Sequence, residues 1–374
     1  MLRFLTAGES HGPCLTAIVE GLPAGLSLNL ELIDRELRRR QGGYGRGGRM
    51  AIEEDRAELL SGVLYGRTTG APVALRIENR DWANWRDRWA SSSLPEVTVP
   101  RPGHADYAGM IKYGLEDARP IAERASARET AARVAVGALA KQLLDQFGIA
   151  VGSYVTAIGG VSANLPDLPH KELWTLAEAS VVRCPDHEAT ADMRTRIDEA
   201  RRGGDSLGGV FVVSATGVPV GLGSHAHWDR RLDARLIWAV TSIPAVKGAE
   251  IGPAFENAGK RGTEVHDEFI PEAPGSVTRA SNRAGGLEGG MTNGMPVVLH
   301  AAMKPIPTTV TPMRSVDLET GEAAETEYQR SDVCAVPAAS IVGEAVVAWT
   351  LAQALMEKLG GDSLAEMQAR ARRL

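Results

Sequence analysis

The sequence predicts a fold that combines helices and sheets, with two Ala-rich helices lying between the sheets. Residues 126–147 and 337–359 are rich in alanine and poor in charge, so both helices are expected to be buried on most sides. Short apolar runs near residues 4–6, 15–19 and 210–222 indicate strands. Because no linker-like stretch divides the 374 residues, we expect one intertwined domain over residues 1–374.

The first half of the chain is expected to form two strands and two helices. The strands near residues 4–6 and 15–19 flank a turn. Asn29 can cap a helix that runs to about Arg40, because its side chain can accept a backbone hydrogen bond. Ser126 opens the S-x-x-E pattern of a capping box, so the first Ala-rich helix is expected to begin there and to stop at Gly148. The buried face of the earlier helix is predicted to hold Leu32, Ile33 and Leu37.

The second half repeats the helix character of the first. A charged helix over residues 186–202 is expected to be a solvated face, and a helix over 232–242 ends before Pro244. The second Ala-rich helix follows Pro337, and residues 361–374 are expected to form a tail. Both Ala-rich helices follow an Arg-Pro or Lys-Pro pair and end in glycine, which indicates an internal duplication with a pseudo-two-fold axis.

The composition excludes several classes of protein. The net charge of −6 argues against general nucleic-acid affinity, which usually requires a basic balance. Cys14, Cys184 and Cys334 lie far apart, so we expect reduced thiols and no disulfide framework. Neither a signal-peptide pattern nor an apolar run of about 18 residues is recognised. The sequence therefore predicts a soluble cytoplasmic protein without a membrane partner.

Two glycine-flanked histidine segments are the candidate catalytic groups. They are residues 8–13, which contain His11, and residues 101–106, which contain His104. Histidine has an unperturbed pKa near neutrality and can move protons at physiological pH, and glycine lets the backbone approach a ligand. A single histidine of this kind is more often a polar loop residue, but the two segments together indicate an acid–base pair.

A cationic segment suggests an anionic ligand. Residues 38–49 hold five arginines and five glycines and are expected to form a mobile loop, because such a composition does not pack as a core element. Arginine can hold a carboxylate or phosphate through two hydrogen bonds. Each arginine alone could be a solvated charge, but the set favours an anion site. That set is Arg40, Arg46, Arg49, Arg101, Arg124, Arg128 and Arg330.

Other motifs carry weaker signals. The glycine-dense segments 203–209 and 282–290 lack the spacing of a dinucleotide-binding turn. Residues 304–309 offer a lysine and two threonines that suit a phosphate-bearing cofactor. His225 and His227 lie on one face of a strand, but without a third ligand we expect no metal site. The spacing of Trp82, Trp85 and Trp89 is more typical of core or interface packing than of a base-stacking platform.

Taken together, these segments resemble the chorismate synthase family. The matching blocks follow the family's order from residue 6 to about 345. They are residues 8–12, 39–47, 101–106, 124–130, 203–206, 245–248, 284–286, 304–305 and 330–332.

The resemblance implies an α+β fold with central helices between antiparallel sheets, assembled as a homotetramer. It implies a lyase that converts 5-enolpyruvylshikimate 3-phosphate to chorismate and phosphate by an anti-1,4-elimination, the last shared step of aromatic biosynthesis. The family requires reduced FMN, which lends an electron and later accepts the hydrogen at N5, although no net oxidation occurs. NADPH would serve only to reduce the flavin.

The resemblance also implies roles for particular residues. His11 would be the general acid at the leaving phosphate, His104 would lie near the N1/C2-carbonyl side of the flavin, and Asp332 would lie near N5. The arginine–glycine loop, about residues 38–50, would close over the flavin. Substrate anions, or NADPH, would be held by Arg40, Arg46, Arg49, Arg101 and Arg128, together with Arg330. The FMN contacts would be Arg124, Ala125, Ser126, Ala245, Gly289, Lys304, Pro305, Ile306, Pro307, Thr308 and Arg330.

Two departures from the family pattern concern the flavin, and two other functions remain open. Ala125 stands where many members have serine, and Pro244 stands where glutamine or asparagine is common. One alternative is a flavin-independent phospho-lyase that uses His11 and His104 as an acid–base pair. Another is an RNA-binding protein that uses the arginine–glycine loop, against which the acidic net charge argues.

Overall fold

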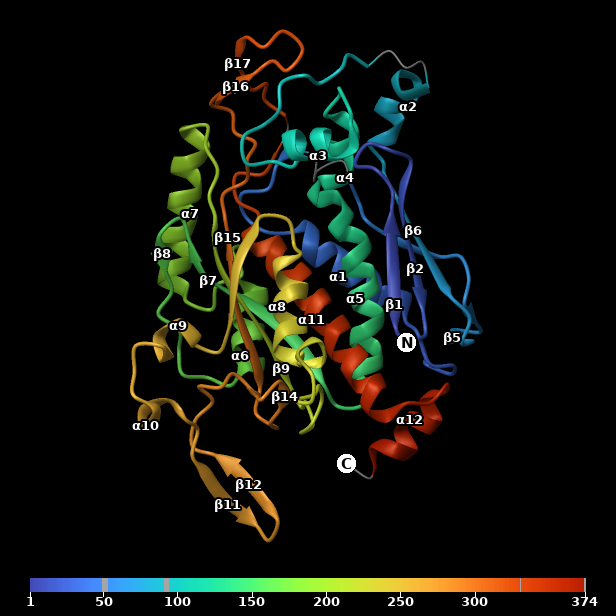
Figure 1. Cartoon of the computed structure of the whole chain (residues 1–374), viewed down its shortest axis with the longest axis vertical. Coiled ribbons are helices and arrows are strands. Elements are labelled where there is room, and N and C mark those ends of the chain that lie inside the picture. The colour runs from blue at the N-terminus through green and yellow to red at the C-terminus, as the bar shows by residue number, and fades with distance from the viewer. Residues whose placement is uncertain (49–52, 91–93, 330, 373–374) are drawn as a thin grey trace.

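A four-stranded and a five-stranded antiparallel sheet enclose a layer of helices (Figure 1). The computed structural model describes residues 1–48, 53–90, 94–329 and 331–372. The first sheet has the order β1-β2-β6-β3 and the second the order β10-β15-β9-β7-β8. The strands of the first sheet are β1 (Arg3–Ala7), β2 (Cys14–Glu20), β6 (Val73–Glu78) and β3 (Ala57–Leu59). Those of the second are β10 (Val246–Ile251), β15 (Val297–Met303), β9 (Gly209–Thr216), β7 (Ala150–Ile158) and β8 (Val161–Ser162).

Two central helices, α5 (Thr130–Asp145) and α11 (Val336–Leu359), lie side by side between these sheets. Helix α5 packs on the first sheet and α11 on the second, while α1 (Leu30–Gln41) contacts both helices. The helices approach closely at Gly137, where a Cβ atom would lie 2.3 Å from the Cβ of Ala345. The predicted sandwich of Ala-rich helices between antiparallel sheets is therefore confirmed.

Further helices pack around the second sheet. Helix α6 (His170–Ala179) lies on its outer side, where the indole of Trp174 donates to the Ser214 hydroxyl, whereas α7 (His187–Arg202) contacts β7 and β8 and buries Met193 and Ile197 in the main core. Helix α8 (Leu232–Thr241) packs against α11 and β10. The outer face of the first sheet is different, since the paired residues Leu5 and Ile18 are 75% and 51% exposed within this chain.

Several elements occur where the sequence predicts them. Asn29 caps α1 by accepting from the Glu31 N–H, α11 has Pro337 in its first turn, and α8 ends at Thr241. Ile33 and Leu37 are fully buried, whereas Leu32 is only partly buried.

The start of α5 corrects one prediction. Ser126 caps a 3₁₀ turn over Ala127–Glu129, and the α-helix begins only at Thr130. The capping box does not form because the Glu129 carboxylate binds the Thr6 hydroxyl and the Arg133 guanidinium instead.

Three further expectations also need correction. Residues 38–41 form the last turn of α1, not part of a loop, and the strand expected to reach residue 222 ends at Thr216. The expected tail forms α12 (Leu364–Ala371), which buries Met367 in the core. Helix α11 is long and apolar enough to cross a membrane by composition alone, contrary to expectation, but 89% of its most apolar window is buried inside the protein.

The remaining elements are short. They are the helices α2 (Trp82–Ala90), α3 (Asp106–Tyr113), α4 (Arg119–Ala125), α9 (Ala254–Asn257) and α10 (Gly262–Val265), and the strand pairs β4 (Val63–Leu64) with β5 (Arg67–Thr68), β11 (Phe269–Ala273) with β12 (Ser276–Arg279), β13 (Leu287–Glu288) with β14 (Met291–Thr292), and β16 (Arg314–Val316) with β17 (Ala323–Glu325).

The contact at Gly137 generates a stability prediction. Replacing glycine by alanine in an open helix stabilises a protein by about 1 kcal/mol. In Gly137→Ala the added methyl group would collide with Ala345, so we expect the free energy of unfolding to fall by about 1–3 kcal/mol. Urea denaturation measures this change. The control is Gly262→Ala in α10, because the nearest atom to an added Cβ there is His266 Nε2 at 3.6 Å. A stabilised Gly137→Ala variant would contradict the packing described.

Candidate active site

A cleft of about 1160 Å³ opens at the N-terminal ends of the two central helices. Its floor includes Ala338 and Val342 of α11 and Arg133 of α5, and its walls come from α2, α4 and the segments around residues 101–104 and 304–308. In Figure 1 this is the upper part of the molecule, where α4 leads into α5. Basic side chains outnumber acidic ones among the described lining residues.

His11 lies in the cleft wall with a buried carboxylate behind it. Its ring Nδ1 is 2.7 Å from Glu123 Oε1, and its backbone N–H donates to Glu123 Oε2 over 2.7 Å. The ring also lies against the indole of Trp85, with 4.2 Å between the ring centroids. Because the carboxylate accepts a hydrogen bond from Nδ1–H, the arrangement leaves Nε2 facing away from Glu123 and available for proton transfer.

His104 is held by a second carboxylate. Its Nδ1 lies 2.5 Å from Asp106 Oδ1, and Arg101 binds the same carboxylate through Nε and Nη2. Burial alone would raise the pKa of Asp106, but the hydrogen bonds from His104 and Arg101 outweigh it and hold this pKa well below its usual range. Asp106 therefore stays ionised and fixes both side chains at the edge of the cleft.

Asp332 joins the segment before α11 to the arginine–glycine segment. Its carboxylate binds Arg46 Nη1 over 2.5 Å and the backbone N–H of Gly47 over 2.7 Å. Both side chains are mostly buried. Residues 42–48 are therefore hydrogen-bonded across the start of α11.

Arg40 and Arg128 lie deep in the cleft, paired with a shared carboxylate. Arg128 Nη1 is 2.5 Å from Asp55 Oδ1, and Arg40 Nη1 is 3.4 Å from Asp55 Oδ2. Arg40 also donates to Thr130 Oγ1 and to the Ala127 carbonyl. Burial lowers the pKa of Arg40 to about 10, although at neutral pH the side chain is still charged. The expectation that Arg40 belongs to a mobile loop is wrong, because it is 4% exposed within α1.

Another part of the cleft offers groups that can hold a phosphate. Lys304 lies there with Nζ bonded to the Gly103 carbonyl, near Thr308. Ala245, which accepts from the Lys304 N–H, has φ +66°, an unusual conformation for a residue with a side chain. Such strain is typical of ligand-contacting backbone. Arg124 and Ser126 line the same cleft, so cation, hydroxyl and backbone donors are present for a phosphate.

Most of the predicted site residues line this one cleft, and some do not. Gly289 lies in the turn between β13 and β14, beside His225, and Pro305 is absent from the lining although its neighbours are present. The predictions for Arg49 and Arg330 concern positions outside the described residues. Those in the cleft are His11, His104, Asp332, Arg40, Arg46, Arg101, Arg124, Ala125, Ser126, Arg128, Ala245, Lys304, Ile306, Pro307 and Thr308.

The structure adds residues that the sequence analysis did not identify. Trp85 belongs to a tryptophan pattern interpreted as packing, yet it contacts His11. Glu123 lies 112 positions from its partner His11, so no local pattern could reveal the pair. Arg88, Arg119 and Arg133 also line the cleft.

Comparison with known proteins gives matches over nearly the whole chain. The family model described as chorismate synthase matches residues 2–356. A chorismate synthase from Desulforudis audaxviator is 56% identical over 98% of this chain and 95% of its own length, and one from Aquifex aeolicus is 54% identical over 99% and 96%. A crystal structure of chorismate synthase matches with a TM-score of 0.81 and 47% identity, covering 100% of this chain and 96% of the other.

The depressed pKa of Asp106 predicts a pH-dependent contribution to stability. An ionised group with a lowered folded-state pKa stabilises the protein above its unfolded pKa of about 4, and the stabilisation is lost as the pH falls toward the folded value. We expect Asp106→Asn to lower the free energy of unfolding at pH 7 by about 1–3 kcal/mol. The difference from the wild type should become smaller between about pH 5 and about pH 3, because the unfolded-state carboxyl group takes up a proton in this range.

Urea denaturation at several pH values measures this difference. The exposed Asp87→Asn variant is the control for loss of a carboxylate. A difference between Asp106→Asn and the wild type that stays constant from about pH 7 to about pH 3 would contradict the proposed ionisation of Asp106.

Proposed function

The chain belongs to the chorismate synthase family, and we propose that the cleft lined by His11, His104 and Asp332 is where it performs the family's reaction. The protein is a lyase that converts 5-enolpyruvylshikimate 3-phosphate to chorismate and phosphate. The observation that most supports this site is that three distant segments bring His11, His104 and Asp332 to one arginine-rich cleft. The comparisons support neither a flavin-independent phospho-lyase nor an RNA-binding protein.

The substrate's charge explains the basic lining. It carries two carboxylates and a phosphate, so several cationic groups must converge to hold it. Arg40, Arg46, Arg101 and Arg128 line the cleft. Arg40 and Arg128 are rigid because Asp55 already binds both, and such fixed donors orient an anion without being ordered at the moment of binding. The role of these arginines as substrate ligands is part of the proposal.

His11 is proposed to protonate the departing phosphate. Glu123 fixes the ring through Nδ1, and Trp85 limits its rotation, so a proton would pass from Nε2. This assignment needs the leaving group to lie on the Nε2 side of the ring.

Reduced FMN is the proposed cofactor. When bound, it would supply an electron and take up the ring hydrogen, chemistry that the described side chains of the cleft do not provide. Lys304, Thr308, Arg124 and Ser126 would hold it, with His104 at its anionic edge and Asp332 near N5. Ala125 and Pro244 both line the cleft, so the hydroxyl and amide that many family members offer are missing there.

Residues 42–48 are proposed to exclude water from the cleft. Arg46 and Gly47 bind Asp332, which lies in the segment just before α11 and lines the cleft. A closed cleft strengthens electrostatic interactions and protects reactive species from solvent.

Assembly, compartment and domain organisation complete the proposal. We propose a homotetramer, because the first sheet exposes Leu5 and Ile18, and the projecting hairpin of β11 and β12 exposes Phe269 (Figure 1). Leu5 and Ile18 are neighbours across β1 and β2, and contiguous exposed apolar patches mark protein–protein interfaces. The three free thiols fit a cytoplasmic protein, and the shared helix layer fits a single domain over residues 1–374. Light scattering on the purified protein tests the tetramer.

The proposed cofactor is tested by anaerobic assay of chorismate formation. We expect product with chemically reduced FMN and none without flavin, because the ring hydrogen is not acidic enough for side chains alone. Oxidised FMN with NADPH distinguishes an enzyme that reduces its own flavin from one that relies on an external reductase. Turnover without any flavin would contradict the proposal and support the flavin-independent lyase.

The proposed acid–base groups are tested by substitution. We expect His11→Ala and His104→Ala each to lower turnover by about 10²-fold or more, the scale of general acid–base catalysis, without loss of the fold. The control is His187→Ala, since His187 is exposed at the start of α7. Near-normal turnover in either variant would remove that histidine from the mechanism.

The role of Glu123 is tested separately. Glu123→Gln keeps the shape of the side chain but removes the charge behind His11, so we expect turnover to fall by about 10-fold or more. The exposed Glu116→Gln in the segment before α4 is the matched control. Equal rates for both variants would show that the carboxylate does not assist His11.

A further inference from the structure

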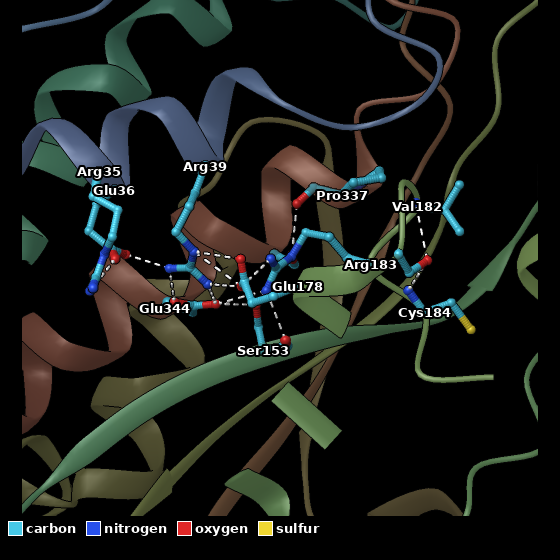
Figure 2. A network of polar contacts seen from close by, with 12 residues as sticks. Arg35, Glu36, Arg39, Ser153, Glu178, Val182, Arg183, Cys184, Pro337 and Glu344 are labelled. Carbon is cyan, nitrogen blue, oxygen red and sulfur yellow. Dashed lines mark hydrogen bonds and ion pairs between the residues drawn. The ribbon is translucent and has the colours of Figure 1, made fainter. Parts of the chain in front are cut away.

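A second group of buried charges lies outside the cleft, around Glu344 of α11. Its carboxylate is 1% exposed and is bound by Arg39 through two nitrogens, over 2.8 and 2.9 Å. Lys141 of α5 and Arg183 of the turn before α7 bind it too, and the Ser153 hydroxyl of β7 donates to it over 2.6 Å. Figure 2 shows how Arg39, Ser153 and Arg183 converge on the Glu344 carboxylate from different elements.

The group pairs opposite charges at its buried centre, which is costly to bury. Three carboxylates, Glu36, Glu178 and Glu344, face three cations, Arg39, Lys141 and Arg183, and the exposed Arg35 also binds Glu36. None of the six lines the cleft. Burial would raise the pKa of Glu344, but the charges of Arg39, Lys141 and Arg183 outweigh it and keep the carboxylate ionised. Because buried ion pairs seldom stabilise more than apolar residues of the same size, such a group is better explained by the geometry that it imposes.

The first connection to the cleft runs through α1. Arg39 and Arg40 are neighbours in its last turn but reach in different directions. Arg39 binds Glu344, whereas Arg40, which lines the cleft, binds Asp55 and Thr130. The end of α1, from which residues 42–48 depart, is therefore held on two sides.

The second connection runs through the turn that carries Arg183. This residue has φ +58°, so its left-handed backbone needs outside support. In the same turn, the Val181 carbonyl accepts the Tyr44 N–H over 2.7 Å. Gly43, just before Tyr44, lies against Pro337 in the first turn of α11, close enough that a Cβ there would be 3.0 Å from the proline side chain.

We propose that Glu344 is a positioning residue that sets the course of residues 42–47, and through them the contact of Arg46 with Asp332. One carboxylate holds both the helix end where the segment begins and the turn that the segment crosses. The catalytic consequence rests on the proposed function, since Arg46 and Asp332 matter only if the cleft binds substrate and flavin. The positioning itself is a property of the chain alone.

The most informative variant is Arg39→Lys. Lysine keeps the charge but cannot span both oxygens of Glu344 while also reaching Glu36 and Glu178. The matched control is Arg38→Lys, the same exchange one residue earlier on an exposed position of the same turn. Glu344→Gln is the second variant, which keeps the shape and removes the charge. Each is compared with the wild type by thermal melting, steady-state kinetics and limited trypsin digestion below the melting temperature.

We expect Arg39→Lys to remain folded, with trypsin cleaving after Arg46 faster than in the wild type, as mapped by mass spectrometry. The kcat/KM for the substrate should fall by about 10-fold or more, mainly through KM, because misplaced binding groups weaken an anion site remote from the substitution. Glu344→Gln should show the same two changes, and Arg38→Lys neither.

Wild-type cleavage and wild-type KM in Arg39→Lys would overturn the proposal, even if its melting temperature fell, because the group would then serve stability alone. Failure of both Arg39→Lys and Glu344→Gln to fold would overturn it as well. If the wild type formed no chorismate, the proposed function would fail, while the cleavage of Arg46 would still test the positioning.

Discussion

The close contact between α5 and α11 is the constraint on which the other features depend. It is possible only because Gly137 has no side chain where Ala345 approaches. Both helices begin at the same end of the molecule, so their first turns form the floor of the cleft (Figure 1). The carboxylate of Glu344 lies next to Ala345 in sequence, and Lys141 lies one turn after Gly137, so the same contact also carries the buried charge group. The Gly137–Ala345 contact and the Lys141–Glu344 ion pair therefore lie on the same two helices, between the two sheets.

Carboxylates define the geometry of a protein whose proposed ligands are anionic. Glu123 orients His11, Asp106 holds His104 with Arg101, Asp55 binds Arg40 and Arg128, and Asp332 binds Arg46. Each pairing lowers the freedom of a cationic or proton-carrying side chain before any ligand arrives. Preorganised groups of this kind stabilise developing charge without a cost of reorientation. The excess of basic side chains in the cleft then remains available to the substrate and the flavin phosphate.

Much of the fold could be predicted from local patterns, whereas the partners in the site could not. The alanine content of α5 and α11, the Asn29 cap and the alternating strands β1 and β2 are encoded within a few residues of where they act. The capping box at Ser126 failed because a distant residue, Thr6, competes for Glu129. Glu123 and Asp55 contact their partners only through tertiary packing. The burial of Met367 of α12 in the core likewise depends on tertiary packing. His11 and His104 were identified from their glycine-flanked segments, and the family resemblance added Asp332 and the role of each residue, but neither says anything of the groups behind them.

The most direct test of this account is an experimental structure of the protein with oxidised FMN and 5-enolpyruvylshikimate 3-phosphate, a combination in which no electron is available and the substrate should persist. We expect the phosphate of the substrate on the Nε2 side of His11, with Glu123 still bonded to Nδ1, and the flavin phosphate near Lys304 and Thr308. A substrate bound with its phosphate away from His11, or a flavin outside the cleft, would contradict the central claim that His11 and its carboxylate deliver the proton for elimination.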